Sequence, residues 1–336
     1  MPLRPLYFVR EKIPMLVVTN NEGTPGVPTT ARLLSEGSPA LAAIEAGIRM
    51  VEIDESIRTV GRGGWPNILG EVELDASVMD GTTLRTGSVG AVRGYLHPIS
   101  IAREVMERLP HVFMVGAGAE RFAREIGAEA GENLIADSKE VWRRWFDHEV
   151  PEADKQRWSE APLIDLCKQS VDPEIGKDTT TFIAQDAKGL IAGGVSTSGW
   201  AWKYPGRLGD SPVIGAGMYA DTRYGACACT GAGEMTIRCG TSRAVVLYMK
   251  MGMSVDKAVR EAVEDMKALK GGLNGRVTIH AIDTKGNHKV VAVNGNAQNV
   301  YWLWRKGEAK PQSLAAEIIT ISDLPAKPAP PAVKYA

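Results

Sequence analysis

The chain is poor in the residues that build metal sites. Its 336 residues include four cysteines, which form no Cys-x-x-Cys pair, and five histidines scattered elsewhere, so the ligand spacing of a zinc site is absent. We therefore expect no metal ion and no other cofactor. Cys227 and Cys229 alternate along a strand-like run, and we expect both thiols to be buried and to pack as small hydrophobic groups rather than to react.

Long runs of one charge and long apolar runs are missing as well. The 39 basic and 40 acidic residues give a formal net charge of -1 and are spread along the chain, which argues against nucleic acid or an anionic membrane as partners. Near the N-terminus, Arg10, Glu11, Lys12 and Pro14 interrupt the apolar residues, so we expect neither a signal peptide nor a membrane span. These features predict a cytoplasmic protein.

The hydrophobic content of 44% is enough for a sizeable core, and the first half of the chain shows both strand-like and helical patterns. Residues 149–178 lack periodicity and are rich in charges and proline, as is typical of an exposed linker. The expected strands are 15–19, 71–80 and 111–115, and the expected helices are 29–51 with a break at 37–39, 98–109, 116–126 and 139–146.

The second half begins with a pattern typical of a hairpin, two strand-like runs joined by a short turn. Helices and antiparallel strands in blocks predict sheets sandwiched between helical layers. The hairpin covers 179–196, further strands are expected at 226–229, 277–282, 289–293 and 300–304, helices at 233–251 and 255–269, and a disordered tail at 325–336.

The junction Asp178-Thr179 lies where the polar segment meets this hairpin. A threonine at the start of a buried strand, preceded by aspartate, is where a self-cleaving threonine hydrolase would cut. If the Asp178-Thr179 bond breaks, Thr179 carries both a hydroxyl nucleophile and a free α-amine that can act as its base. One residue would then supply two catalytic groups.

Two further segments carry hydroxyl or main-chain groups suited to amide hydrolysis. Thr197 ends the second strand of the hairpin, where its hydroxyl could return to Thr179 and orient the nucleophile. Thr230 and the N–H of Gly231 stand where a strand is expected to become a helix. Free N–H groups and the helix dipole at such a place favour developing negative charge, as in an oxyanion hole.

Arg207 and Asp210 are three residues apart in a glycine-rich turn. The guanidinium could hold an α-carboxylate and the carboxylate an α-ammonium, so the pair suits a zwitterion. Each feature also has a simpler interpretation: Thr179 as ordinary strand propensity, Arg207 and Asp210 as a surface salt bridge, and Thr230 as a helix cap. Their occurrence within about fifty residues, in segments where glycine permits close approach, favours the functional interpretation.

Motifs over most of the chain resemble the glycosylasparaginase, or aspartylglucosaminidase, family of N-terminal nucleophile hydrolases. They are GRGGWPNILGEVELDASVMDG at 61–81, HPISIAREVMERLPHVFMVG at 97–116, KDT at 177–179, GRLGDSPVIGAG at 206–217 and CTGAGE at 229–234. The resemblance implies an α+β fold, a four-layer αββα sandwich with largely antiparallel sheets. It also implies cleavage into segments 1–178 and 179–336 that together form one domain, and a homo-oligomer of the cleaved subunits.

The resemblance implies an amidohydrolase that cleaves the β-amide of an asparagine derivative, such as N4-(β-N-acetylglucosaminyl)-L-asparagine, through a threonyl ester. By position it assigns Thr179 as the nucleophile, the Asp178-Thr179 bond as the autocleavage site and Thr197 as the neighbouring hydroxyl. It assigns Thr230 and Gly231 as the oxyanion donors. The substrate-binding residues that it implies are Arg207, Asp210, Gly233 and Thr59.

The chain departs from the family pattern at two places. Lys177 stands where the family has His, and Thr181 replaces a glycine close to the nucleophile. The family's tryptophan that lines the substrate pocket corresponds to Asn20, with no aromatic residue nearby. This second departure favours an alternative, an isoaspartyl peptidase or threonine-type L-asparaginase, which differs in the leaving group.

A different class of function is a nucleotide-binding protein, since residues 115–118 and 214–220 have the glycine spacing of a strand-glycine-helix turn. A relative without catalytic activity is a further alternative. Of the tryptophans, which we expect mainly to pack in the core, Trp65, Trp200 and Trp202 are expected to border the pocket.

Overall fold

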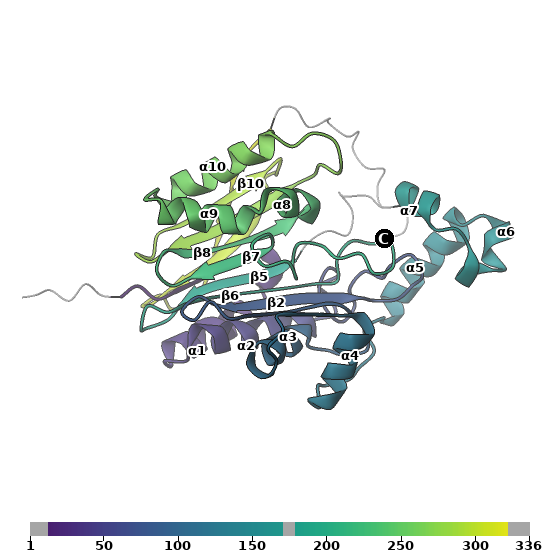
Figure 1. The fold of residues 1–336 in the computed structure, drawn as a ribbon, viewed down its shortest axis with the longest axis horizontal. Coiled ribbons are helices and arrows are strands. Elements are labelled where there is room, and N and C mark those ends of the chain that lie inside the picture. The colour runs from purple at the N-terminus through teal and green to yellow at the C-terminus, as the bar shows by residue number, and fades with distance from the viewer. Residues whose placement is uncertain (1–12, 171–178, 322–336) are drawn as a thin grey trace, which may run out of the picture.

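Two β-sheets pack face to face, and helices cover both outer faces (Figure 1). The structure is a computed structural model, and it describes residues 13–170 and 179–321. Helices α1 to α4 lie against the larger sheet and α8 to α10 against the smaller one, whereas α5 to α7 lie beside one end of the sandwich (Figure 1). The predicted α+β sandwich with largely antiparallel sheets is confirmed.

The larger sheet has eight strands, and only its edge pair β3 and β4 is parallel. Strands from before and after Thr179 are interleaved in it, since β1 pairs with both β5 and β11, and β6 pairs with β2. In spatial order the strands are β12 (Gln312–Ala315), β11 (Val300–Arg305), β1 (Leu16–Asn20), β5 (Thr180–Gln185), β6 (Ile191–Thr197), β2 (Leu74–Asp80), β3 (Thr86–Val92) and β4 (Phe113–Val115).

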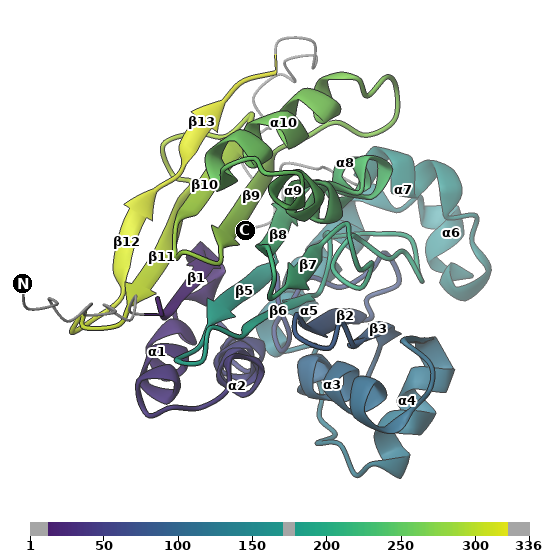
Figure 2. The ribbon, with the colours of Figure 1, turned by 60° about the vertical axis from the view of Figure 1, so that its left-hand side comes forward.

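The smaller sheet has five strands and packs against the larger one (Figure 2). Its edge strand β13 joins β10 in parallel, and the other pairs are antiparallel. In spatial order the strands are β13 (Glu317–Ile319), β10 (His288–Val293), β9 (Val277–Asp283), β8 (Gly225–Gly231) and β7 (Met218–Asp221).

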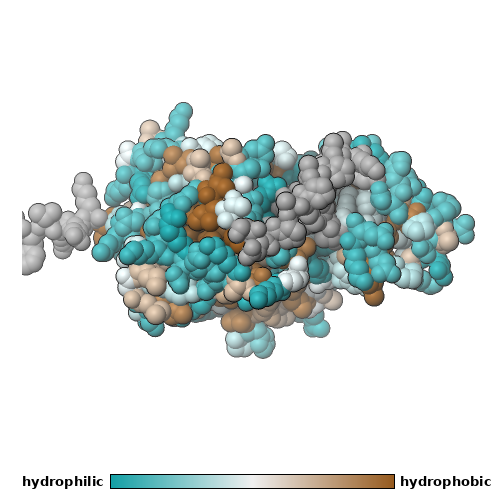
Figure 3. Space-filling view, turned by 90° about the horizontal axis from the view of Figure 1, so that it is seen from above, coloured by the Kyte–Doolittle hydropathy of each residue, from teal (hydrophilic) through white to brown (hydrophobic). Residues whose placement is uncertain are grey.

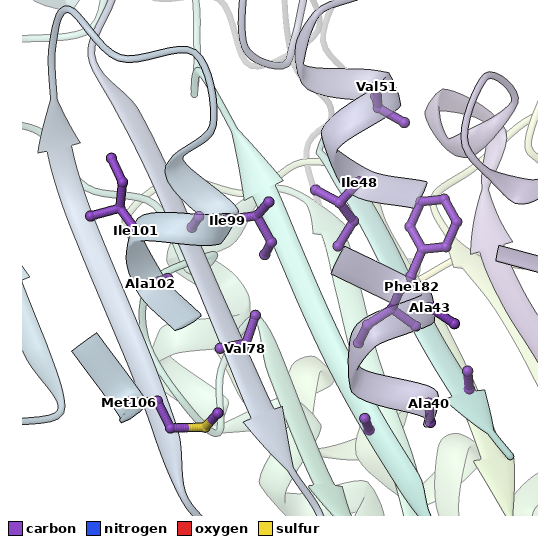
Figure 4. Close-up of a cluster of buried hydrophobic side chains, with 14 of the residues drawn as sticks. Ala40, Ala43, Ile48, Val51, Val78, Ile99, Ile101, Ala102, Met106 and Phe182 are labelled. Carbon is purple, nitrogen blue, oxygen red and sulfur yellow. The ribbon is translucent and has the colours of Figure 1, made fainter. Parts of the chain in front are cut away.

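The helices bury apolar faces against the outer sides of the two sheets. In the larger sheet, Val78 and Phe182 point toward α2 and α3, where they meet Ile48 and Ile99 (Figure 4). The helices are α1 (Val27–Ser35), α2 (Ala40–Glu52), α3 (Pro98–Arg108), α4 (Gly116–Glu125), α5 (Ala136–Glu149), α6 (Glu152–Lys155), α7 (Ile164–Ser170), α8 (Gly233–Cys239), α9 (Thr241–Lys250) and α10 (Val255–Lys267).

A third apolar cluster fills the space between the sheets. Because side chains alternate along a strand, Ile183 of β5, Val195 of β6 and Ala228 of β8 face this inner layer, while Phe182 faces the helices. The same alternation directs positions 179, 197 and 230 toward the space between the sheets. The candidate site therefore lies at the space between the two sheets.

One expected helix and the expected linker differ from the sequence prediction. The helix expected over 233–251 is two helices, α8 and α9, because Gly240 takes a left-handed conformation with φ of +58° between them. The expected irregular linker contains α6 and α7, and the apolar residues Leu163 and Leu166 pack beside a tryptophan cluster. Residues 171–178 and the expected tail at 325–336 lie outside the described residues.

The tryptophan cluster lies between α5 and the loop after β6. Trp145 stacks on Trp202 with ring centroids 5.0 Å apart, and Trp65 meets Trp202 edge-on at 6.2 Å. Trp142 and Trp158 belong to the same cluster. Core packing of these rings is therefore confirmed, and it extends to Trp65 and Trp202, which were expected to border a pocket.

The outer surface over α8 to α10 is mostly hydrophilic, with a small apolar area (Figure 3). Within residues 13–170 and 179–321, no helix combines the length and apolar character that a bilayer crossing needs.

The segment 214–220 forms a loop and strand β7 rather than a glycine turn into a helix, so its interpretation as a nucleotide site is wrong. Residues 115–118 do lead from a strand, β4, into a helix, α4.

Candidate functional site

Thr179 and Thr197 lie at neighbouring ends of the central hairpin. In the register of β5 and β6, Thr180 pairs with Ser196, so the next residues outward, Thr179 and Thr197, stand opposite each other. Both are buried, with 5% and 3% of their surface exposed, and both face the inner layer by strand alternation. The structure thus brings together the first two residues that the sequence singled out.

Asn20 binds the backbone on both sides of Thr180. Its side-chain amide donates to the Thr179 carbonyl oxygen, and its Oδ1 accepts from the Thr181 N–H at 3.0 Å. Glu22 accepts a further hydrogen bond from the same amide nitrogen at 2.5 Å. From the sequence, Asn20 was noted only as the residue that replaces the family's tryptophan, and its hydrogen bonds to the backbone were not predicted. A polar residue at the end of an apolar strand indicates such hydrogen bonds, because buried polar groups need partners.

Thr197 is held by the loop that precedes the glycine-rich motif. Its hydroxyl donates to the Thr59 carbonyl at 3.2 Å and accepts from the Gly199 N–H at 2.9 Å. The Ser198 N–H also donates to Thr59, at 2.8 Å. Thr59 therefore contacts Thr197 and Ser198 through its main-chain carbonyl. Its side-chain hydroxyl is buried without a hydrogen bond to any described residue.

Arg207 is fixed by an acid and an aromatic ring. Its guanidinium donates to Glu234 Oε1 at 2.6 and 3.0 Å and lies 4.4 Å from the centroid of the Trp200 ring. Such stacking and ion pairing hold a planar cation in one orientation. Trp200 therefore borders the candidate site, as predicted. Glu234 was not predicted as a partner.

Asp210 lies buried under the start of α8, with 3% of its surface exposed. Thr236 donates to its Oδ2 at 2.6 Å, and burial raises the pKa of this carboxyl to about 6. The expected alternative, a surface salt bridge between Arg207 and Asp210, is wrong because Asp210 is buried and Arg207 pairs with Glu234.

Gly233 leaves room for this carboxylate. A Cβ at position 233 would stand 2.7 Å from both the backbone nitrogen and Oδ1 of Asp210, closer than real contacts allow. The absence of a side chain therefore lets α8 begin directly over Asp210. The close approach of Asp210 is therefore a physical reason for glycine at position 233, which the resemblance assigned to substrate binding.

A buried acid and a buried lysine support the loop beneath Arg207. Lys203 is almost fully buried, and its Nζ donates to the carbonyl oxygens of Glu73 and Ser198 at 2.9 and 3.0 Å. Asp75 of β2 accepts from the Ala91 N–H at 2.8 Å. Burial raises the pKa of Asp75, while the charges of Lys203 and Arg207 oppose that rise. These residues were not predicted.

Thr230 and Gly231 end strand β8 on the other side of the inner layer. Gly231 has a φ of +106°, and a Cβ there would lie 2.3 Å from the Arg276 carbonyl, so no other residue fits without movement. The N-cap residue of α8 is Ala232, and the interpretation of Thr230 as a helix cap is therefore wrong. The predicted change from strand to helix at this point is confirmed.

A cavity of about 230 Å³ opens next to Thr230 and Asn20, and we call it the polar cavity. Carboxylate, guanidinium, amide, hydroxyl and imidazole groups form most of its wall, and none of its described lining residues is Phe, Tyr or Trp. The lining residues are Asn20, Asn21, Glu22, Thr230, Arg276, Thr278, His280, Asn296, Gln298, Asn299 and Val300.

The thiols do not take part in this arrangement. Cys227 and Cys229 of β8 are fully buried and pack toward α9 and α10, which confirms their prediction as small hydrophobic groups. Burial raises the pKa of Cys229 well above its ordinary value, so its thiol stays protonated and unreactive. Asp178 and Lys177 lie outside the described residues.

Comparison with known proteins identifies the family. The asparaginase family profile matches residues 25–314. An N(4)-(beta-N-acetylglucosaminyl)-L-asparaginase of Elizabethkingia miricola is 39% identical over 251 residues, which cover 75% of this chain and 68% of the relative. An isoaspartyl peptidase/L-asparaginase of Rattus norvegicus is 35% identical over 74% of this chain and 70% of its own length. A plant-type L-asparaginase of Pyrococcus abyssi is 34% identical, over 83% and 88%. The chain therefore belongs to the asparaginase family and is a hydrolase acting on amide bonds.

Proposed function

We propose that the chain is a threonine amidohydrolase that activates itself by cutting the Asp178-Thr179 bond and then cleaves the β-amide of asparagine derivatives. The observation that carries this proposal is the position of Thr179, buried and opposite Thr197 at the inner ends of β5 and β6. A nucleophile at this place has a second hydroxyl beside it, and the side chain of Asn20 holds its carbonyl.

In the activation step, the Thr179 hydroxyl attacks the carbonyl carbon of Asp178. The peptide C–N bond breaks, the amine takes up a proton, and an ester links Asp178 to the Thr179 oxygen. Water then hydrolyses the ester and releases a carboxylate on Asp178 and a free hydroxyl and α-amine on Thr179. Segments 1–178 and 179–336 remain together as one domain, because strands of both pair within the eight-stranded sheet.

In the mature enzyme, the α-amine of Thr179 accepts the hydroxyl proton as the oxygen attacks the β-amide carbon. An α-amine has a reference pKa of about 7.7 to 8.0 and is partly neutral at physiological pH. Thr197 orients the nucleophile, and Thr230 with the Gly231 N–H stabilises the oxyanion. The leaving amine departs with a proton, and water hydrolyses the β-aspartyl ester to release aspartate.

The substrate's α-groups are bound by Arg207 and Asp210. Arg207 offers a guanidinium oriented by Glu234 and Trp200, which suits an α-carboxylate. The Asp210 carboxylate, in the space that Gly233 leaves open, suits an α-ammonium. Thr59 supports this site indirectly, through the carbonyl that holds Thr197.

Release of aspartate from asparagine derivatives tests the proposal. We expect the wild-type enzyme to release it and Thr179→Ala to release none, since the variant lacks the nucleophile. Thr320→Ala removes the hydroxyl of an exposed threonine and should keep wild-type turnover. If Thr179→Ala retains turnover comparable with Thr320→Ala, Thr179 is not the nucleophile.

A second candidate differs only in the leaving group. The relatives named above are an N(4)-(beta-N-acetylglucosaminyl)-L-asparaginase, an isoaspartyl peptidase/L-asparaginase and a plant-type L-asparaginase. Asn20 stands where the glycosylasparaginase pattern has tryptophan, and this favours the peptidase or asparaginase reaction. A homo-oligomer of cleaved subunits and a cytoplasmic location stay predictions.

A further inference from the structure

A buried acid, Glu52, lies behind the strand that ends in Thr197. Side chains alternate along β6, so Ser196 faces the covering helices while Thr197 faces the space between the sheets. The Ser196 hydroxyl donates to Glu52 Oε1 at 2.7 Å. Glu52 is the last residue of α2, and its side chain is fully buried. The acid therefore contacts the end of β6 from the side opposite the proposed reaction.

The start of α3 fixes the carboxylate of Glu52. The Ile99 N–H donates to Oε1 at 3.0 Å, and His97 Nδ1 lies 3.2 Å from Oε2. Burial raises the pKa of Glu52, and the hydrogen bond with His97 is the largest effect that opposes this rise. A carboxylate among apolar side chains such as Ile48 (Figure 4) is costly unless such partners surround it. The oxygen that accepts from Ser196 is thus held in place by a segment outside β6.

The main chain of Glu52 also anchors the loop that holds Thr197. Its carbonyl accepts from the Arg62 N–H at 2.7 Å. Gly61, with a φ of +58°, permits this close return, because a Cβ there would stand 2.1 Å from the Glu52 oxygen. Within the loop, the Thr59 carbonyl accepts from the Thr197 hydroxyl at 3.2 Å. The acceptor for that hydroxyl is therefore tied to the same residue.

We propose, on the basis of the function proposed above, that Glu52 is a positioning residue that fixes the hydroxyl of Thr197 beside the nucleophile Thr179. Its carboxylate holds the end of β6 through Ser196, and its main-chain carbonyl holds the loop that accepts from Thr197. Asn20 holds the start of the neighbouring strand β5. Glu52 thus does for the second strand of the hairpin what Asn20 does for the first.

A positioning role and a purely structural role predict different kinetics. A small displacement of a reacting or orienting group lowers the rate of the chemical step. The α-groups of the substrate are bound by Arg207 and Asp210, which belong to another loop. Loss of the contact between Ser196 and Glu52 should therefore lower kcat and leave KM nearly unchanged, whereas general loosening of the site would change both.

Ser196→Ala tests the carboxylate contact. We expect kcat for asparagine, counted per cleaved chain, to fall about tenfold, or about 1.4 kcal/mol in activation free energy. KM should stay within about twofold of the wild-type value. Ser88→Ala is the matched control, because it removes a buried hydroxyl from β3 of the same sheet that makes no hydrogen bond to a described residue. This control should keep the wild-type kcat, and both variants should cleave themselves completely.

Two further variants test the two parts of Glu52 separately. Glu52→Gln keeps a side-chain oxygen that can accept from Ser196, so its kcat should stay within about threefold of the wild-type value. Gly61→Ala places a Cβ against the Glu52 carbonyl and should lower kcat about tenfold by displacing the loop. Gly116→Ala is the control, since Gly116 has a similar φ of +50° and a Cβ there meets nothing within 4 Å.

Equal kcat values for Ser196→Ala and Ser88→Ala overturn the inference, as does a KM in Ser196→Ala that rises as much as kcat falls. A kcat in Glu52→Gln as low as in Ser196→Ala, or equal values for Gly61→Ala and Gly116→Ala, also contradicts it. Each of these results leaves the proposed function standing, since the wild-type enzyme still cleaves itself and hydrolyses asparagine. A wild-type chain that does neither contradicts the proposed function itself.

Discussion

The side-chain amide of Asn20 donates a hydrogen bond to the main-chain carbonyl of Thr179. The same side chain accepts from the N–H of Thr181, so the end of β1 fixes the start of β5 from both sides of Thr180. If Thr179 is the nucleophile, the orientation of its hydroxyl depends on how firmly this short backbone segment is held. Asn20 is thus a positioning residue for the proposed reaction.

Asn20→Ala should lower kcat by about tenfold or more, because a buried carbonyl and a buried N–H lose their partner at a cost of roughly 1–3 kcal/mol each. KM for asparagine should change less than kcat, since Asp210 and Arg207 are untouched. Asn287→Ala, in the exposed turn between β9 and β10, is the control. Steady-state kinetics that show an unchanged kcat in Asn20→Ala would count against the positioning role.

Gly233→Ala should raise KM by about tenfold or more. The new Cβ would stand 2.7 Å from Asp210 Oδ1, so the carboxylate must move from the place where it would bind the α-ammonium, at a cost typical of overpacking, about 1–3 kcal/mol. Gly118→Ala is the matched control, because a Cβ in the first turn of α4 meets only the end of Met114, at 3.8 Å. Similar KM values for the two variants would contradict this account of Asp210.

The kcat/KM for asparagine should fall steeply below pH 6. Burial raises the pKa of Asp210 to about 6, so below that pH the carboxyl is increasingly protonated and no longer attracts the substrate ammonium. The Thr179 α-amine must be deprotonated as well, and log kcat/KM should therefore rise with a slope near two below pH 6 and near one between pH 6 and the pKa of that amine.

Succinamate is the control substrate for this pH dependence, because it has the β-amide and a carboxylate but no α-ammonium. Its hydrolysis should not depend on the charge of Asp210, and its profile should keep a slope near one below pH 6. A slope of one for both substrates down to pH 5 would mean that Asp210 does not bind the ammonium group.

Lys203→Met should destabilise the fold by about 3 kcal/mol or more, since removal of one partner from a buried charged group leaves the other uncompensated. The buried Asp75 would lose the charge that most strongly opposes its desolvation, and two buried carbonyls would lose a donor. Thermal unfolding should show a Tm several degrees lower. Lys257→Met, at an exposed position on α10, should keep the wild-type Tm, and an equal Tm in both variants would contradict the structural role of Lys203.

The sequence predicted the sandwich because its strands and helices carry clear periodic patterns. The register of the hairpin followed from the turn at 186–189, and Thr197 was therefore expected near Thr179, as the pairing of Thr180 with Ser196 confirms. The break at Gly240 was missed because the apolar pattern of 233–251 continues through it. Only the backbone shows that this glycine is left-handed.

The partners of the site residues could not be predicted in the same way. Asn20 and Thr179 are separated by 159 residues, and Arg207 and Glu234 meet only because α8 starts beside the glycine-rich loop. Such contacts depend on the order of strands in a sheet, which no local pattern encodes. The sequence therefore indicated which residues carry chemistry, while the fold determines what each one touches.

The most direct test of the central claim is the intact mass of freshly purified protein followed over time. We predict that the 36.2 kDa chain gives way to two fragments, the second of which begins at Thr179, and that aspartate release rises in step with cleavage. Thr179→Ala should remain one piece. A wild-type chain that stays whole and yet hydrolyses asparagine derivatives at full rate would contradict the account.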